Sequence, residues 1–213
     1  MGKKYASIHI LAEGNENIIL KIKEYYKKDI FKAKKEEALN MVKDERIRWM
    51  IENLPGFSAN EVLIILTEFF ISIYDESISF ETVEETVKML SKTIDEPLLY
   101  FSNFDDDIYI FGGYKMGRLV SNRRLGYGLD DYGMDPKELN SAKFCNVFST
   151  FKKEFMEHLN RIEEIVTIEN EIEKCLQLPL DMRLDDAQTN NEIYIEMSHE
   201  DGVYIYKSYT NKL

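Results

Sequence analysis

Cysteine, proline and tryptophan are scarce in this chain of 213 residues, which contains two, four and one of them, respectively. So few cysteines exclude a fold that depends on a disulfide framework, and the spacing of Cys145 and Cys175 matches no zinc-binding pattern. Both cysteines lie in apolar stretches with helical periodicity. We therefore expect two buried thiols that pack as small hydrophobic side chains.

Long hydrophobic runs are also absent. The longest apolar stretch, from Val62 to Tyr74, includes Thr67 and Glu68 and is shorter than the roughly 20 residues that a membrane-spanning helix needs. The N-terminal segment, Met-Gly-Lys-Lys-Tyr, is not followed by an apolar signal core. These features predict a cytoplasmic protein that does not bind membranes.

The charge balance is strongly acidic. Asp and Glu number 39 against 27 Lys and Arg, which gives a formal net charge of −12. Such a surface repels phosphate backbones and anionic lipids, so we expect no nucleic-acid partner. Hydrophobic residues make up 44% of the chain, a share that excludes a disordered protein and supports a packed core.

Alternating apolar residues and runs of β-branched and aromatic residues predict strands. The expected strands in the first part of the chain are residues 5–11, 62–66, 69–74, 98–104, 108–114 and 119–122. A further hairpin is expected at the C-terminus, around a turn at Asp201 and Gly202, and it should return to an edge of the sheet.

Apolar residues spaced three and four apart predict helices between and after these strands. The expected helices follow Asn15, cover residues 80–94 behind the cap residue Ser79, run from Pro136 to Ile162, and cover residues 168–176. In the helix over 80–94, the stripe that includes Val83, Val87 and Leu90 should face the core.

Together these elements predict an α+β fold with a mainly antiparallel sheet. One strand, one helix and two strands follow each other in residues 69–120, and residues 5–28 begin in the same way. This likeness favours a duplicated βαββ arrangement, followed by a helical segment and a terminal hairpin. The glycine-rich loop at 126–134 divides a sheet domain (1–125) from a helical segment with the hairpin (126–213), and we expect the two to pack as one unit.

The common catalytic and nucleotide-binding motifs are missing: there is no GxxxxGK[ST], GxGxxG, GxSxG or HExxH. His9, His158 and His199 occur without a metal-ligand pattern. We therefore expect no catalytic residue, no metal site and no cofactor.

Carboxylates are the only side chains that offer a candidate functional site. Asp105, Asp106 and Asp107 are expected at a hairpin tip, where consecutive aspartates commonly form a solvated turn. The alternatives are a surface that faces a basic partner and, less in keeping with the pattern, a divalent-metal site.

Tyrosine is abundant, and three tyrosines belong to the expected terminal hairpin. Alternation places Tyr194, Tyr204 and Tyr206 opposite a set of aliphatic residues. If the aliphatic face is core, these tyrosines form an aromatic and acidic surface suited to protein recognition. The alternative is that they pack beneath the C-terminal helices.

Three functions are compatible with the sequence. The first is a non-catalytic acidic module, a bacterial immunity-like or regulatory partner of a basic protein. The second is a small-ligand sensor, in which a cleft in the sheet would be lined by Trp49, Tyr100, Phe101, Tyr109 and Phe111. The third is an enzyme that uses carboxylates.

Overall fold

The computed structural model describes residues 2–12, 16–27, 62–67, 69–75, 77–182, 194–200 and 203–209. Its strands form one eight-stranded sheet in the order β6-β5-β4-β1-β3-β2-β7-β8, in which every neighbouring pair is antiparallel. The strands are β1 (Lys4–Leu11), β2 (Val62–Leu66), β3 (Phe70–Asp75), β4 (Leu98–Phe104), β5 (Ile108–Lys115), β6 (Arg118–Leu125), β7 (Tyr194–Glu200) and β8 (Val203–Tyr209). The predicted α+β class with an antiparallel sheet is confirmed.

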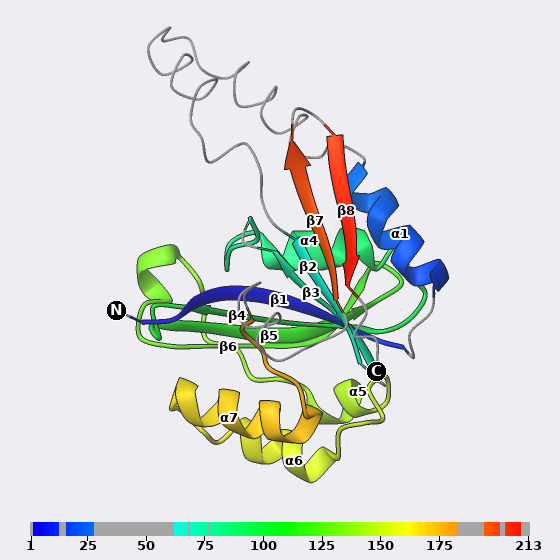
Figure 1. Cartoon of the computed structure of the whole chain (residues 1–213). Coiled ribbons are helices and arrows are strands. Elements are labelled where there is room, and N and C mark those ends of the chain that lie inside the picture. The colour runs from blue at the N-terminus through cyan, green and yellow to red at the C-terminus, as the bar shows by residue number, and fades with distance from the viewer. Residues whose placement is uncertain are drawn as a thin grey trace, which may run out of the picture.

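Helices cover both faces of the sheet (Figure 1). One face carries α1 (Glu16–Lys27) and α4 (Val83–Leu90), and the other carries α5 (Ser141–Cys145), α6 (Lys153–Leu159) and α7 (Ile165–Leu176). Within the described residues, no helix combines the length and the apolar character that crossing a membrane requires.

Each face of the sheet has its own hydrophobic core, because successive side chains of a strand point to opposite faces. On β1, Ile8 and Ile10 belong to the core under α1 and α4, whereas Tyr5 and Leu11 pack against the core under α5–α7. The sheet is therefore the middle layer of three, and both faces of its central strands are buried.

The helix α4 confirms the predicted stripe, since Val83, Val87 and Leu90 are all buried. It begins later than expected. The backbone N–H of Ser79 donates to Oγ1 of Thr82 at 2.9 Å, which forms a turn ahead of the helix. Phe80 is still buried in the same core.

The predicted hairpin of β4 and β5 is present. β4 and β5 pair from Phe104 and Ile108 onward, with the turn at residues 105–107. β2 and β3 also pair as a hairpin, although Thr67 and Glu68 are unusual turn residues. Thr67 compensates with its side chain, because Oγ1 accepts from the backbone N–H of Phe70 at 3.1 Å.

The terminal hairpin of β7 and β8 joins the sheet because β7 pairs with β2. It extends one edge of the sheet, as predicted. Figure 1 shows this hairpin extending beyond the three-layer body beside α1. The sheet thus ends at β8 on one side and at β6 on the other.

The single helix expected from Pro136 to Ile162 is wrong. The chain instead forms the short α5 and α6, with turns between them. These turns bring Phe148 over the sheet, so close to Gly113 that a Cβ there would lie 2.2 Å from the Phe148 ring. A continuous helix presents one stripe, whereas Phe144, Phe148 and Phe151 form a compact buried cluster.

The duplicated βαββ arrangement is visible in part. β3, α4, β4 and β5 follow one another as predicted, and β1 and α1 open the chain. Of the strands expected between residues 30 and 66, β2 is present, and residues 28–61 lie outside the described part. The first run includes β1 and β2, and the second includes β3, β4 and β5. Because β1 lies between β3 and β4 in the sheet, the strands of the two runs alternate there and do not form two adjacent units.

Candidate functional site

Two acidic segments that are separate in sequence meet at one end of the sheet. The turn of Asp105, Asp106 and Asp107 lies against the loop at 126–134, because the backbone N–H of Gly128 donates to the Asp107 carbonyl oxygen at 3.2 Å. We define the acidic tip as the residues of this end that carry exposed charge or aromatic surface. They are Asp105, Asp106, Asp107, Tyr127, Asp130, Asp131 and Tyr132.

A glycine permits this contact. Gly126 has a φ of 128°, and a Cβ at this position would lie 1.9 Å from the carbonyl oxygen of Asp107. No residue with a side chain fits there. The apposition of the two acidic segments is therefore built into the backbone.

The turn itself is held by local polar contacts. Asp105 and Asp106 have φ values of 56° and 59°, a left-handed conformation that Asp tolerates better than most residues. Nζ of Lys4 lies 2.9 Å from Oδ2 of Asp105, and Nδ2 of Asn103 donates to Oδ1 of Asp106 at 2.9 Å. Two of the three carboxylates thus have partners within the chain.

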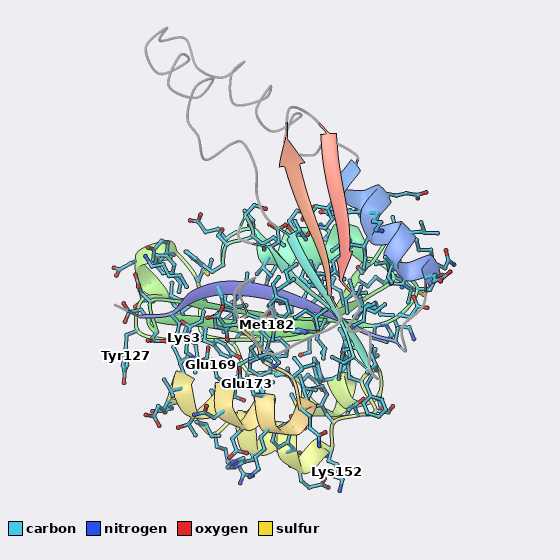
Figure 2. All side chains as sticks on the ribbon, in the orientation of Figure 1. Lys3, Tyr127, Lys152, Glu169, Glu173 and Met182 are labelled. Carbon is cyan, nitrogen blue, oxygen red and sulfur yellow. The ribbon has the colours of Figure 1, made fainter. Side chains whose placement is uncertain are left out.

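The neighbouring loop is anchored at one point and exposed at others. Leu129 is buried at 1% exposure, and the ring of Tyr132 packs edge-on against Phe80, with ring centroids 4.9 Å apart. Tyr127, between two glycines, is 96% exposed. Its side chain points away from the body in Figure 2.

The acidic tip keeps unneutralised charge. Asp107, Asp130 and Asp131 are exposed, and none of them takes part in the ion pairs found within the described residues. An exposed tyrosine beside free carboxylates is the combination that the sequence suggested for the terminal hairpin. The structure shows this combination at the acidic tip, and the Gly-Tyr-Gly sequence was the available signal.

The hairpin tyrosines do not form one set in the backbone register. Tyr204 and Tyr206 pair with His199 and Met197, whereas Tyr194 pairs with Tyr209. Tyr194 therefore belongs to the other alternating set of positions than Tyr204 and Tyr206, contrary to the expected common face. The side chains of these residues lie outside the described part.

The aromatic residues expected in a ligand cleft are divided between the two cores. Tyr100 is buried in the core under α1 and α4, whereas Phe101, Tyr109 and Phe111 are buried in the core under α5–α7. The sheet separates these two groups, so these four residues do not line one common cleft. Trp49 lies outside the described residues.

The carboxylate of Glu84, on α4, holds this helix to the sheet. Glu84 accepts hydrogen bonds from Tyr100 at 2.8 Å and from Asn122 at 2.6 Å, and it pairs with Arg124 at 2.8 Å. Burial, and next the charge of Glu84, raise the pKa of the Tyr100 hydroxyl well above its ordinary value. The carboxylate joins the helix to two strands and is fully engaged in doing so.

Among the histidines whose burial the structure describes, His9 is the buried one, and it lies between two serines. Nδ1 of His9 is 2.8 Å from the hydroxyl of Ser72, and Nε2 is 3.0 Å from the hydroxyl of Ser7. Burial lowers the pKa of His9 to about 3, so the ring is neutral at physiological pH. Because all three side chains are buried, a substrate has no access to either hydroxyl, and the arrangement differs in this respect from a serine nucleophile with its base.

The remaining reactive groups do not assemble into a site. Among the described residues, no three His, Cys, Asp or Glu side chains come together in a way that could hold a metal ion. The expected burial of the thiols is wrong, since Cys145 is half-buried and Cys175 is exposed. Burial and neighbouring glutamates raise the pKa of both thiols, which disfavours the reactive thiolate.

Comparison with known proteins identifies no relative. No family model, no curated protein and no solved structure matches the chain.

Proposed function

We propose that this protein is a non-catalytic interaction module that binds a basic protein through the acidic tip. The observation that carries the proposal is the position of Tyr127, which is 96% exposed beside the free carboxylates of Asp107, Asp130 and Asp131. A fully exposed tyrosine beside carboxylates that form no ion pair within the described residues offers a partner both contact area and a polar end.

The chemistry of the tip suits such a partner. Tyrosine supplies a large contact area with a polar end and is enriched among the residues that dominate binding energy. The surrounding carboxylates would steer a basic partner toward the tip and raise the association rate at low salt. An immunity-like or regulatory partner of a basic protein has this kind of surface.

The rest of the molecule is consistent with a binding role. The carboxylate of Glu84 and the imidazole of His9 are engaged within the fold, so neither is available as an acid, a base or a nucleophile. The tip itself lies on a turn and a loop held by a rigid sheet, the usual location of binding residues.

Photo-crosslinking from position 127 tests the proposal. Tyr127 would be replaced by p-benzoylphenylalanine, and the protein would be illuminated in a lysate of its source cells at low and high salt. We expect a basic protein to be crosslinked, with less product at high salt. The triple variant D107N/D130N/D131N on the same background should lose the product.

A matched control removes the same number of charges elsewhere. Glu154, Glu163 and Glu171 lie on or beside α6 and α7, and E154Q/E163Q/E171Q should crosslink as the wild type does. A product that survives removal of the tip charges, or one that is lost equally in the control, contradicts the proposal.

A further inference from the structure

The turn between β5 and β6, at the end of the sheet opposite the acidic tip, has exposed cations around it, although Asp95 and Glu96 also lie at this end. β5 leads from the turn at 105–107 to the turn between β5 and β6, so the two turns lie about 26 Å apart at 3.3 Å per residue. We define the basic end by the cations around this second turn and the exposed apolar residues beside them. They are Lys92, Lys115, Arg118 and Lys143, with Met89 and Met116.

Three elements bring these residues together. The backbone N–H of Gly117 donates to the carbonyl oxygen of Ser91, just after α4, at 3.0 Å. The side chain of Lys92 lies over the same glycine, since a Cβ on Gly117 would be 2.9 Å from its Cγ. From α5, Nζ of Lys143 donates to the carbonyl oxygen of Leu119 at 3.4 Å.

Two features of the turn are unfavourable for the fold. Lys115 and Arg118 are directly paired across the hairpin, and like charges in this position destabilise a sheet. Met116 has a φ of 50°, a conformation that is uncommon for a side chain of this kind, and it is 66% exposed. The two-residue turn requires positive φ at both of its central positions, so the backbone of Met116 is explained by the hairpin, whereas its exposed side chain and the paired cations serve no contact within the turn.

The cations of the basic end are available for a partner. None of Lys92, Lys115 and Arg118 belongs to the ion pairs found in the described part of the chain. The two ends cannot neutralise each other within one molecule, because about 26 Å exceeds the screening length of about 8 Å at physiological ionic strength.

We propose that the basic end docks the acidic tip of a second copy of this chain, head to tail. This inference rests on the proposed role of the tip as a binding surface and names one partner for it. The charges are complementary, and the exposed Met116 would meet the exposed Tyr127, a favourable pairing of sulfur with an aromatic ring. The contact is heterologous, because it joins two different surfaces. The first and last copies of an open chain keep one free surface each, so longer oligomers form as the protein concentration rises.

Salt distinguishes this contact from nonspecific attraction. Two copies with a net charge of −12 each repel at long range, and salt screens this repulsion before it weakens charges in direct contact. We expect association to be stronger at 0.15 M salt than at about 0.01 M, and to fall again at 1 M.

Sedimentation of two complementary variants tests the proposal. K115Q/R118Q removes the two cations that flank the turn of the basic end and leaves the tip intact, whereas D107N/D130N/D131N removes the unpaired charges of the tip and leaves the basic end intact. We expect the wild type to form concentration-dependent oligomers and each variant alone to be a monomer. Their mixture should form a 1:1 dimer and nothing larger, because only one intact pair of surfaces remains.

The control K152Q/K174Q removes two exposed lysines, one just before α6 and one on α7, and should sediment as the wild type does. A monomeric wild type at high protein concentration overturns the inference, and so does a mixture that stays monomeric. Binding of the wild type, but not of K115Q/R118Q, to phosphatidylserine vesicles without any self-association also overturns it, in favour of a lipid partner.

The same variant separates this inference from the proposed function. K115Q/R118Q retains the acidic tip, so it can serve as the crosslinking bait when Tyr127 carries the photoreactive group. If it captures a foreign basic protein while the wild type is monomeric, the proposed function stands and the head-to-tail contact fails.

Discussion

The hydroxyl group of Tyr5 on β1 donates a 2.6 Å hydrogen bond to Oε1 of Glu169 on α7. The same oxygen accepts from Asn103 at 2.7 Å, and Oε2 pairs with Lys3 at 3.1 Å. Lys3, Glu169 and Glu173 appear together between the sheet and α7 in Figure 2. A carboxylate that is 1% exposed thus fastens the helical layer to the N-terminal strand.

Replacing Glu169 should test the strength of this attachment. Glu169→Ala leaves the Tyr5 hydroxyl without this acceptor and Asn103 with Asp106 alone, and we expect the free energy of unfolding to fall by about 2–4 kcal/mol. Glu169→Gln keeps one acceptor oxygen and should lose less. Urea titration measures both, with Glu171→Ala as a control on the same helix, and equal stabilities of all four proteins would contradict the assigned role.

The burial of His9 predicts a pH dependence of stability. Its pKa is about 3 in the folded protein, against 6.5 ordinarily. The unfolded chain therefore binds a proton below pH 6.5 that the folded protein does not bind until about pH 3. The stability that the neutral His9 contributes is fully present above pH 6.5. Between pH 6.5 and about pH 3 the free energy of unfolding falls by about 1.4 kcal/mol for each unit that the pH is lowered.

Urea titrations between pH 7.5 and 4.5 measure this dependence. His9→Gln should be less stable at pH 7, because glutamine fits imperfectly between Ser7 and Ser72. The slope of its free energy of unfolding against pH should be smaller by the value that corresponds to one bound proton. His158→Gln, on the exposed side of α6, is the matched substitution with which His9→Gln is compared. An identical slope in wild type and His9→Gln would show that His9 titrates alike in both states.

Elements with local signals could be predicted from the sequence, and contacts between distant segments could not. The hairpin of β4 and β5 was predictable because two apolar runs flank three aspartates. The acidic tip was not, since it depends on the close approach of Gly126 to Asp107, which no spacing encodes. Tyr127 was visible only as a residue between two glycines.

The error over residues 136–162 has a different origin. Phe144, Phe148 and Phe151 recur at helical spacing, and a stripe of this kind predicts one long helix. The same residues also fit a compact cluster on the sheet, where Phe148 fills the space above Gly113. Periodicity records which residues are buried and does not record where the chain turns between them.

Gly113 and Phe148 should show this packing in a double-mutant cycle. A Cβ at Gly113 would lie 2.2 Å from the Phe148 ring and 3.3 Å from the carbonyl oxygen of Leu98. Gly113→Ala should therefore cost about 1–3 kcal/mol. In the Phe148→Leu background the additional cost of Gly113→Ala should be smaller, because the ring atoms are gone. Additive effects in urea titrations would mean that the two residues do not pack together.

The acidic turn should tolerate the loss of all its carboxylates. Asparagine adopts positive φ at least as readily as aspartate, so D105N/D106N/D107N keeps the conformation at Asp105 and Asp106. The variant loses the pair of Asp105 with Lys4, an exposed interaction worth about 0–1 kcal/mol, and gains relief from repulsion among neighbouring charges. We expect the melting temperature to change by no more than a few degrees.

The same two proteins test for a metal site at the turn. Millimolar Mg²⁺ or Ca²⁺ should leave the melting temperature of both proteins unchanged, whereas a bound ion would raise that of the wild type by mass action. A shift in the wild type that the triple variant lacks would identify the turn as a metal site and would count against a purely electrostatic role for the acidic tip.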